Sequence, residues 1–224
     1  MDLKEERKLW KKGYRVIVGL DESGRGALAG PVVAAAVMIK KSKIKNLKIL
    51  KQIKDSKKLT PKQRKNLYKI LINSDLIEWG IGKVGPRVID RINILEATKL
   101  AMKRAVRNLK SKVKSQKSKI DFLILDGNFK INSSLLQKSV IKGDGKIVSC
   151  AVASILAKVT RDEAMQRYHK KYPQYGFDKH KGYPTRYHKK MLKKYGPCKI
   201  HRKSFKPLIS LKSFLLKLEK LENA

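Results

Sequence analysis

Short apolar runs divide the chain into a series of expected strands. Runs rich in β-branched residues and bounded by turn residues predict strands, and they fall at 14–20, 31–39, 76–84, 121–127 and 139–145. The first two are joined by a glycine-rich turn, so we expect them to form a hairpin. The run at 121–127 contains the uninterrupted apolar stretch FLIL at 122–125, which is typical of a strand in the interior of a sheet.

Apolar residues at helical spacing predict helices between these strands. Residues 55–73 are expected to be helical, with Thr60 as the N-cap and Pro61 in the first turn. The apolar stripe of this helix would be formed by Leu67, Ile70 and Leu71.

Further helices are predicted at 93–109 and 149–172, and the lysine-rich segment 110–119 is expected to be a mobile loop. A leucine stripe at helical spacing marks residues 208–224 and favours packing into the core or self-association over binding a partner helix. Strands and helices arranged around one sheet predict an α/β fold with a helical C-terminal region.

The charge of the chain favours a polyanionic partner. There are 55 Lys and Arg against 18 Asp and Glu, a net charge of +37, which suits nucleic acid or an anionic membrane surface. A lysine-rich compositional habit is the alternative explanation. No apolar run approaches the ~18 residues that a membrane span needs, and the N-terminus lacks the apolar region of a signal peptide. We therefore expect a cytoplasmic protein that does not enter a membrane.

The two cysteines, Cys150 and Cys198, are too few for a disulfide framework and indicate a reducing compartment. The sequence CKIH at 198–201 resembles half of a zinc site. No second pair of ligands stands at a suitable spacing, so a structural role is expected for these residues.

Acidic residues are scarce, and four of them follow apolar runs: Asp21, Glu22, Asp126 and Asp144. The C-terminal ends of strands are where α/β sheets bind ligands. If these strands are neighbours, the carboxylates converge and their repulsion favours a divalent cation such as magnesium. Taken singly, Asp126 and Asp144 have an alternative as ordinary turn residues.

The adjacent pair Asp21 and Glu22 raises a geometric problem. Side chains of neighbouring strand residues point to opposite faces. For both to reach one metal cluster, we expect the backbone to leave strand geometry here, which Gly24 and Gly26 permit.

The segment Gly24-Arg25-Gly26 follows directly. Its glycines allow close approach of backbone amides and carbonyls to a ligand, and a backbone that donates and accepts suits a ribose 2′-hydroxyl. A plain tight turn is the alternative. Neither this segment nor GIGKVG at 80–85 has both the spacing and the context of a dinucleotide-binding loop.

Several motifs in order resemble the bacterial ribonuclease HII family, the type 2 ribonucleases H. They are GLDESGRGALAGPVVAAAV, DSKKL, IDRINILEATKLAM, LDGN, KGD, ASILAKVTRD, YPQYGFDKHKGYPT and HRKSF. The resemblance implies a ribonuclease-H-like fold, a five-stranded mixed sheet flanked by helices with a helical C-terminal extension. It places the domain at 14–207, with a catalytic core at 14–165, a helical region at 166–207 and a tail at 208–224.

The resemblance also assigns roles to residues. Asp21, Glu22, Asp126 and Asp144 match the family's acids for two Mg²⁺ or Mn²⁺ ions, which are also its catalytic residues. Gly24, Arg25 and Gly26 match the backbone that reads the 2′-hydroxyl, and Tyr183 matches a tyrosine that packs on the following deoxyribose. Ser56 and Lys57 match a segment near substrate phosphates. The motif GRG, rather than GTG, favours ribonuclease HII over ribonuclease HIII.

The activity implied is hydrolysis of RNA in RNA–DNA hybrids and at single ribonucleotides in duplex DNA, leaving 3′-hydroxyl and 5′-phosphate ends. Such an enzyme would be a monomer and act in ribonucleotide excision repair and DNA replication. The alternatives are a non-catalytic basic RNA-binding protein, which leaves the four acids unexplained, and another two-metal nuclease that would also cleave all-DNA duplex.

Overall fold

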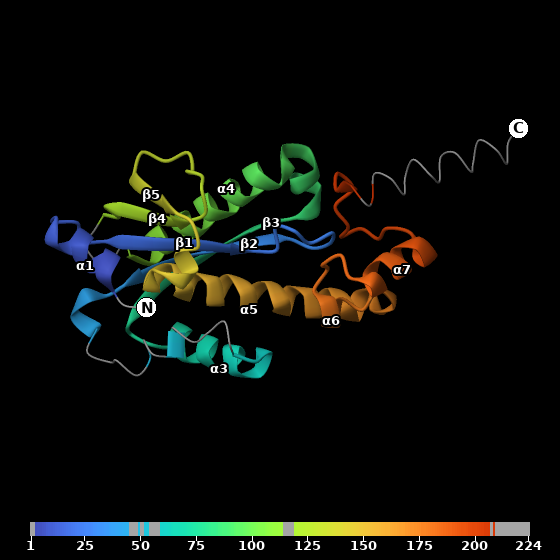
Figure 1. The fold of residues 1–224 in the computed structure, drawn as a ribbon, viewed down its shortest axis with the longest axis horizontal. Coiled ribbons are helices and arrows are strands. Elements are labelled where there is room, and N and C mark those ends of the chain that lie inside the picture. Colours follow the sequence, from blue (N-terminus) through green and yellow to red (C-terminus); the bar gives the residue numbers. More distant parts are fainter. Residues whose placement is uncertain are drawn as a thin grey trace, which may run out of the picture. The chain divides into compact units, whose positions relative to one another are not determined.

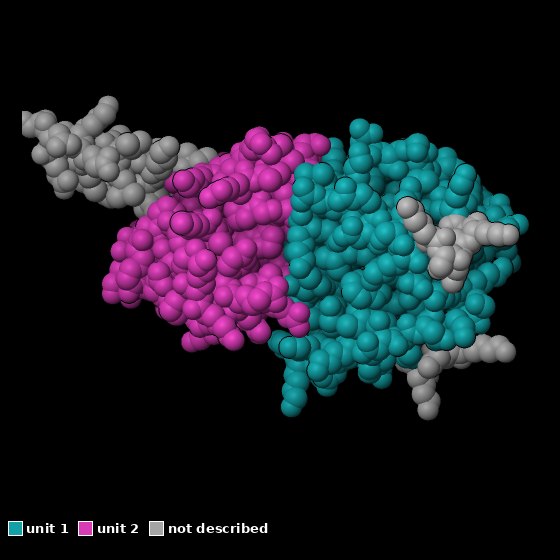
Figure 2. Space-filling model, turned by 180° about the vertical axis from the view of Figure 1, so that it is seen from behind, with its two compact units in different colours: residues 1–23, 33–83, 98–160 teal, residues 24–32, 84–97, 161–224 magenta. Residues whose placement is uncertain are grey.

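The chain forms two compact units in the computed structural model (Figure 2). The first unit comprises residues 1–23, 33–83 and 98–160, and the second comprises 24–32, 84–97 and 161–224. Each has its own cluster of buried apolar side chains. The residues that the structure describes are 3–44, 49, 52–53, 59–113, 119–206 and 208.

A five-stranded sheet in the order β3-β2-β1-β4-β5 organises the fold (Figure 1). Its strands are β1 Ile17–Ser23, β2 Val32–Ile39, β3 Ile77–Val84, β4 Phe122–Asp126 and β5 Leu136–Val140. β1 pairs antiparallel with β2, which confirms the expected hairpin. β1 and β4 are parallel, as are β4 and β5, so the sheet is mixed as expected.

The sheet carries helices α4 (Pro86–Val113) and α5 (Val148–Lys171) on opposite faces (Figure 1). In β3, Gly80 and Gly82 face α4 so closely that a Cβ on either would overlap the helix backbone. The alternate residues of β3, Trp79 and Ile81, pack with the apolar cluster on the other face. Because alternate residues of a strand face opposite sides, the glycines of β3 allow α4 to pack closely on one face. The larger side chains between them fill the core on the other face.

A short N-terminal helix, α1 (Lys4–Lys11), is one element that the sequence reading did not include. Its Glu6 is 1% exposed and accepts hydrogen bonds from the backbone N–H and the hydroxyl of Ser149, both at 2.9 Å. Ser149 lies in the first turn of α5, so Glu6 supplies an acceptor to a helix start, where N–H groups lack partners within the helix.

The helix predicted at 55–73 is α3, Pro61–Ile72. Thr60 is its N-cap, as expected, and Gln63 completes a capping box. Leu67 and Leu71 are buried, but Ile70 is 47% exposed, so its place in the predicted apolar stripe is wrong. Residues 54–58 lie outside the described part of the chain.

Three other predicted boundaries differ from the structure. The strand expected at 139–145 runs from Leu136 to Val140, and Gly143–Gly145 forms a 3-10 turn, η3. The helix expected at 93–109 extends in both directions as α4, interrupted at Asn93 (φ 63°). Residues 110–113 are therefore helical, whereas 114–118 and the stripe beyond 208 lie outside the described residues.

The second unit packs short elements against the segment 24–32. These are η4 Pro173–Tyr175, α6 Phe177–His180 and α7 Arg186–Tyr195; the remaining described 3-10 element, η1 Lys41–Lys43, belongs to the first unit. Leu28 donates to the carbonyl of Gly182 at 2.8 Å and accepts from the backbone N–H of Arg202 at 2.8 Å. These bonds join chain segments that are far apart in sequence. Among the described residues, no helix has the length and apolar character needed to span a membrane.

Candidate metal and nucleic-acid site

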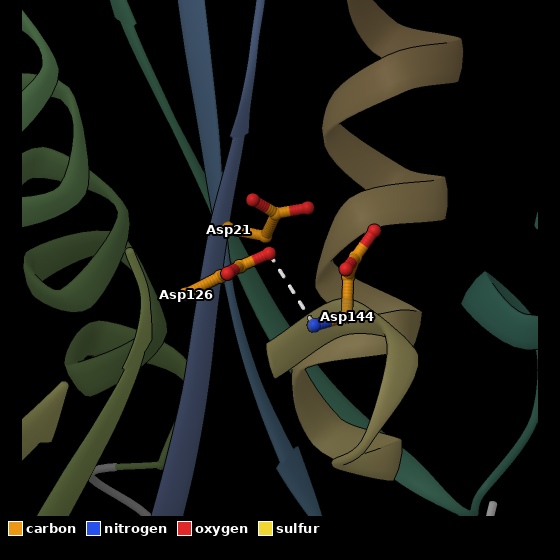
Figure 3. A group of neighbouring side chains, drawn as sticks. All are labelled: Asp21, Asp126 and Asp144. Carbon is orange, nitrogen blue, oxygen red and sulfur yellow. Dashed lines mark hydrogen bonds between the residues drawn. The ribbon is translucent and has the colours of Figure 1, made fainter. Parts of the chain in front are cut away.

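Three of the four predicted acids come together in the first unit (Figure 3). Asp21, Asp126 and Asp144 each offer one carboxylate oxygen, and these oxygens lie within 4.8 Å of one another. They are the one such group of His, Cys, Asp or Glu side chains among the described residues. We call them the carboxylate cluster.

Strand register and one turn build this cluster. Leu20 of β1 is paired with Leu125 of the parallel strand β4. The next residue of each strand is an aspartate, so Asp21 and Asp126 lie side by side just after this pair. The η3 turn adds Asp144. Its backbone N–H donates to one oxygen of Asp126 at 3.3 Å (Figure 3). The N–H of Gly143 donates to the other oxygen at 2.9 Å.

The electrostatics of Asp21 suit a cation. Its side chain is buried, and its pKa is raised well above the usual value by desolvation first and then by the charges of Glu22 and Asp126. A hydrogen bond from Ser154 of α5 opposes that rise. Clustered carboxylate oxygens are the donors that Mg²⁺ and Mn²⁺ prefer, and a divalent cation would remove the mutual repulsion. The cluster therefore fits a hard divalent metal.

Glu22 lies outside the cluster because β1 does not end where the sequence suggested. The strand continues to Ser23, with Asp21 opposite Ala35 and Glu22 opposite Ala34 of β2. The expectation that the backbone leaves strand geometry at this pair is wrong. Neighbouring strand residues ordinarily point to opposite faces, yet the charge of Glu22 raises the pKa of Asp21 more than that of Asp126 does. Glu22 therefore acts electrostatically on the cluster without being one of its three members.

The segment Gly24-Arg25-Gly26 begins the second unit. Gly24 has φ +96°, and a Cβ there would overlap the side chain of Arg161, so the position requires glycine on two counts. Gly26 differs, since a Cβ there would meet nothing within 4 Å. The two glycines thus have separate reasons for being present.

Two buried arginines, which the sequence reading left without a role, fix this segment. Arg202 donates to the carbonyls of Gly24 at 2.7 Å, Arg25 at 2.8 Å and Gly30 at 3.0 Å. Both Arg161 and Arg202 are 0% exposed. Burial lowers the pKa of each guanidinium, but arginine stays charged at neutral pH.

Arg161 packs against Gly24 of the same segment and against the predicted sugar-binding tyrosine. It donates to the carbonyls of Pro31 at 3.0 Å and Lys181 at 2.9 Å. Its guanidinium carbon also lies 5.3 Å from the ring centroid of the half-buried Tyr183. The second unit thus brings together Tyr183 and the segment that contains Gly24, Arg25 and Gly26. The only sequence signal for these arginines is that both lie in motifs of the family resemblance.

Two other expectations concern residues near the ends of motifs. Ser56 and Lys57 lie outside the described residues, so their phosphate contact stays a prediction.

Cys198 donates its backbone N–H to Nδ1 of His201 at 2.9 Å, so CKIH forms a hydrogen-bonded turn. Cys150 is buried and contacts the carbonyl of Ile124 in the sheet.

Comparisons with known proteins agree in sequence and in fold. The family described as Ribonuclease HII matches residues 18–208. A protein named ribonuclease HII from Caldicellulosiruptor bescii is 48% identical over 207 residues, covering 92% of this chain and 94% of that one. The crystal structure of ribonuclease H2 from Pyrococcus horikoshii has a TM-score of 0.70 and 28% identity, covering 90% of this chain and 99% of that one.

A third comparison shows the fold alone. The crystal structure of Bst-RNase HIII in complex with Mn²⁺ has a TM-score of 0.66 at 18% identity, covering 89% of this chain and 70% of that one.

Proposed function

The chain belongs to the ribonuclease HII family and is therefore a hydrolase, and we propose that it cleaves the RNA strand of RNA–DNA hybrids and nicks duplex DNA at embedded ribonucleotides. The products would carry 3′-hydroxyl and 5′-phosphate ends. The observation that carries this proposal is the carboxylate cluster, because phosphodiester hydrolysis by this route needs closely spaced oxygen ligands for divalent metal.

In this proposal, Asp21 and Asp126 are the central metal ligands, with Asp144 and Glu22 completing the two coordination shells. When bound, two Mg²⁺ or Mn²⁺ ions supply a water of lowered pKa and positive charge opposite the leaving oxygen. Ser154 and the N–H groups of η3 orient the carboxylates that they contact. The proposal for Glu22 requires its side chain to turn toward the cluster, since it starts outside the group of three.

For substrate recognition, the backbone of Gly24, Arg25 and Gly26 would bind the ribose 2′-hydroxyl and Tyr183 would pack on the next deoxyribose. The support is that Arg202 bonds the carbonyls of Gly24 and Arg25, and that Arg161 packs against Gly24 and borders the ring of Tyr183. Preorganised groups of this kind select substrates without an ordering cost at binding. Ser56 and Lys57 would contact phosphates of the same duplex.

The remaining features of the proposal concern the whole protein. The high positive charge would supply sequence-independent, salt-sensitive affinity for the substrate backbone. We propose that the enzyme acts as a cytoplasmic monomer in ribonucleotide excision repair and DNA replication. Its type 2 ribonuclease H domain would cover residues 14–207, with the tail at 208–224 outside the catalytic unit.

A nicking assay tests the proposal. Three duplexes of one sequence would be compared with Mg²⁺ and with Mn²⁺: all DNA, DNA with one ribonucleotide, and an RNA–DNA hybrid. Cleavage of the second and third, but not the first, is expected. Binding without cleavage would instead favour a non-catalytic RNA-binding protein, and cleavage of all three would favour a nuclease without sugar selectivity.

A further inference from the structure

Three of the four histidines of the chain gather in the second unit, at positions that the proposed reaction does not use. His188 and His201 are 0% and 2% exposed, and the ring of His180 stacks on that of His188 with centroids 4.4 Å apart. The ring of Phe177 packs against all three imidazoles, with centroid separations between 5.5 and 5.8 Å. Buried imidazoles of this kind need defined hydrogen-bond partners.

Two of these histidines form a directed chain of hydrogen bonds. The backbone N–H of Cys198 donates to Nδ1 of His201, so in neutral His201 the proton is on Nε2. That Nε2 lies 3.0 Å from Nε2 of His188, which must therefore accept. His188 then carries its proton on Nδ1, which lies 2.9 Å from the carbonyl oxygen of Tyr183. We call this chain, from Cys198 through His201 and His188 to Tyr183, the histidine relay.

Each link of the histidine relay determines the tautomer at the next one. An additional proton on either imidazole would place two N–H groups face to face between His188 and His201, or would break the bond from Cys198. Burial lowers the pKa of both histidines to about 4. The relay is therefore uncharged at neutral pH, with a single hydrogen-bond direction that ends on Tyr183.

The far end of the relay lies on a backbone that is held at several points. The carbonyl of Tyr183 also accepts from the N–H of Thr185 at 2.8 Å, and the N–H of Tyr183 donates to the carbonyl of His180 at 2.9 Å. To these backbone bonds His188 adds a side-chain bond, from Nδ1 to the carbonyl of Tyr183. A side chain bonded to this carbonyl restricts the position of the Tyr183 backbone and therefore the direction in which the tyrosine ring projects.

We propose that His188, oriented by His201, is a positioning residue that holds Tyr183 where it packs on the deoxyribose beside the ribonucleotide. This inference rests on the proposed function of Tyr183 and adds the residues that make its position reproducible. The property that this positioning would affect is selectivity for a single embedded ribonucleotide. A long hybrid can be cleaved at many positions along its RNA strand, so its cleavage depends less on one sugar contact.

Two isosteric replacements of His188 separate positioning from simple packing. In H188N the amide nitrogen lies near the position of Nδ1 and can still donate to the carbonyl of Tyr183, but the bond to His201 is lost. In H188Q the amide reaches the position of Nε2, so the bond to His201 is kept and the one to Tyr183 is lost. Each variant removes one link, and a merely structural role predicts equal effects.

The corresponding pair at His201 should show the reverse pattern. H201Q can still donate to His188, whereas H201N keeps only the acceptor for Cys198. In H201N the imidazole of His188 loses the donor that fixes its proton on Nδ1, whereas the amide nitrogen in H188N carries its protons without help from His201. For all four variants, kcat and KM would be measured on a single-ribonucleotide duplex and on a hybrid of equal length. We expect H188Q and H201N to lower the ratio of kcat/KM between these substrates about three- to tenfold, mainly through KM. H188N and H201Q should stay within about twofold of the original ratio.

Thermal unfolding of every variant accompanies the kinetics, and either histidine pair alone decides the question if one member of the other pair does not fold. Equal ratios within each folded pair would overturn the relay. Tyr183→Ala separates a failure of the proposed function of Tyr183 from a failure of the histidine relay alone. If that variant keeps the original ratio, the proposed function of Tyr183 fails; if it loses selectivity while H188Q keeps it, only the relay fails.

Discussion

Arg202 donates a hydrogen bond of 2.7 Å to the carbonyl of Gly24, the first residue of the proposed sugar-reading segment. The same guanidinium bonds Arg25 and Gly30, so one planar group fixes three carbonyls. Each carbonyl has a second lone pair, so the bonds to Arg202 leave acceptor capacity on Gly24 and Arg25. The arginine therefore determines the conformation of a segment whose backbone is proposed to meet the substrate.

Replacing Arg202 by lysine should impair selectivity. A lysine keeps the charge but concentrates its donors at one atom, so it cannot span the three carbonyls. Loss of one or more bonds from a charged donor predicts a fall of about ten- to a hundredfold in kcat/KM on a single-ribonucleotide duplex. The exposed neighbour Lys203 provides the control, because K203Q should change cleavage of that duplex and of a long hybrid alike. Original selectivity in R202K would contradict the role of the guanidinium.

The two glycines of the segment should respond differently to alanine. G24A would place a side chain on a backbone with positive φ and would overlap Arg161. We therefore expect the free energy of unfolding to fall by roughly 1–3 kcal/mol, with a lower melting temperature, and cleavage to be lost. G26A has space for its methyl group, so its melting temperature should be unchanged. Any loss of cleavage in G26A would then report close approach of the substrate. A strongly destabilised G26A would contradict the open space around this position.

Asp126→Asn should abolish metal-dependent cleavage without unfolding the protein. Metal catalysis contributes several kcal/mol, so the expected loss in kcat is at least about a thousandfold. Removing the charge of Asp126 relieves the repulsion that raises the pKa of Asp21, but an amide can accept only one of the two N–H bonds from η3. These effects oppose each other, so the metal-free melting temperature should change little. A variant with wild-type kcat would remove Asp126 from the proposed site.

Metal binding should also appear as stability. A ligand that binds only the folded state at a hundredfold excess over its Kd contributes about 2.7 kcal/mol. Mn²⁺ should therefore raise the melting temperature of the unsubstituted enzyme, measured by calorimetry, and raise that of D126N by less. Chelation should reverse the gain, and an equal gain in both proteins would place the metal elsewhere.

Glu6→Gln should change the pH dependence of stability. Burial raises the pKa of Glu6 above 4.5. A carboxyl with a raised pKa in the folded state contributes stability fully below its unfolded pKa, and this contribution is lost as the pH rises through the folded value. E6Q keeps an acceptor for Ser149 and cannot ionise, so its melting temperature at pH 7 should equal or exceed that of the unsubstituted enzyme, with a flatter profile between pH 4 and 7.

Glu5 offers the control of opposite sign. Hydrogen bonds from Lys138 and Lys8 lower its pKa, so its contribution is present above the unfolded pKa and is lost as the pH falls. E5Q should therefore have a slightly lower melting temperature at pH 7 and no effect at acidic pH. Parallel profiles for E5Q and E6Q would contradict the burial of Glu6 against α5.

The sequence allowed the sheet and all three members of the carboxylate cluster to be predicted, because apolar runs and scarce acids are local signals. Asp21, Asp126 and Asp144 were found in this way, and the structure brings them together. The position of Glu22 could not be predicted from the chain, because it depends on pairing of β1 with β2 through Ser23.

The roles of the buried arginines could not be predicted from local pattern for a different reason. The partners of Arg202 lie 172 to 178 residues away along the chain, and charged residues are buried only where such partners exist. The same holds for Glu6, whose partner Ser149 is 143 residues away. Only the fold reveals that these charges face inward.

The sequence separation of 178 between Gly24 and Arg202 also sets an order for synthesis. A nascent chain that ends before residue 161 contains the four proposed metal ligands, but lacks both arginines that hold the carbonyls of 24–31. Since chains fold progressively as they leave the ribosome and contacts distant in sequence form late, metal-binding groups can assemble before the sugar-reading segment takes its final shape. Selectivity for ribose would then be the last property that the growing enzyme acquires.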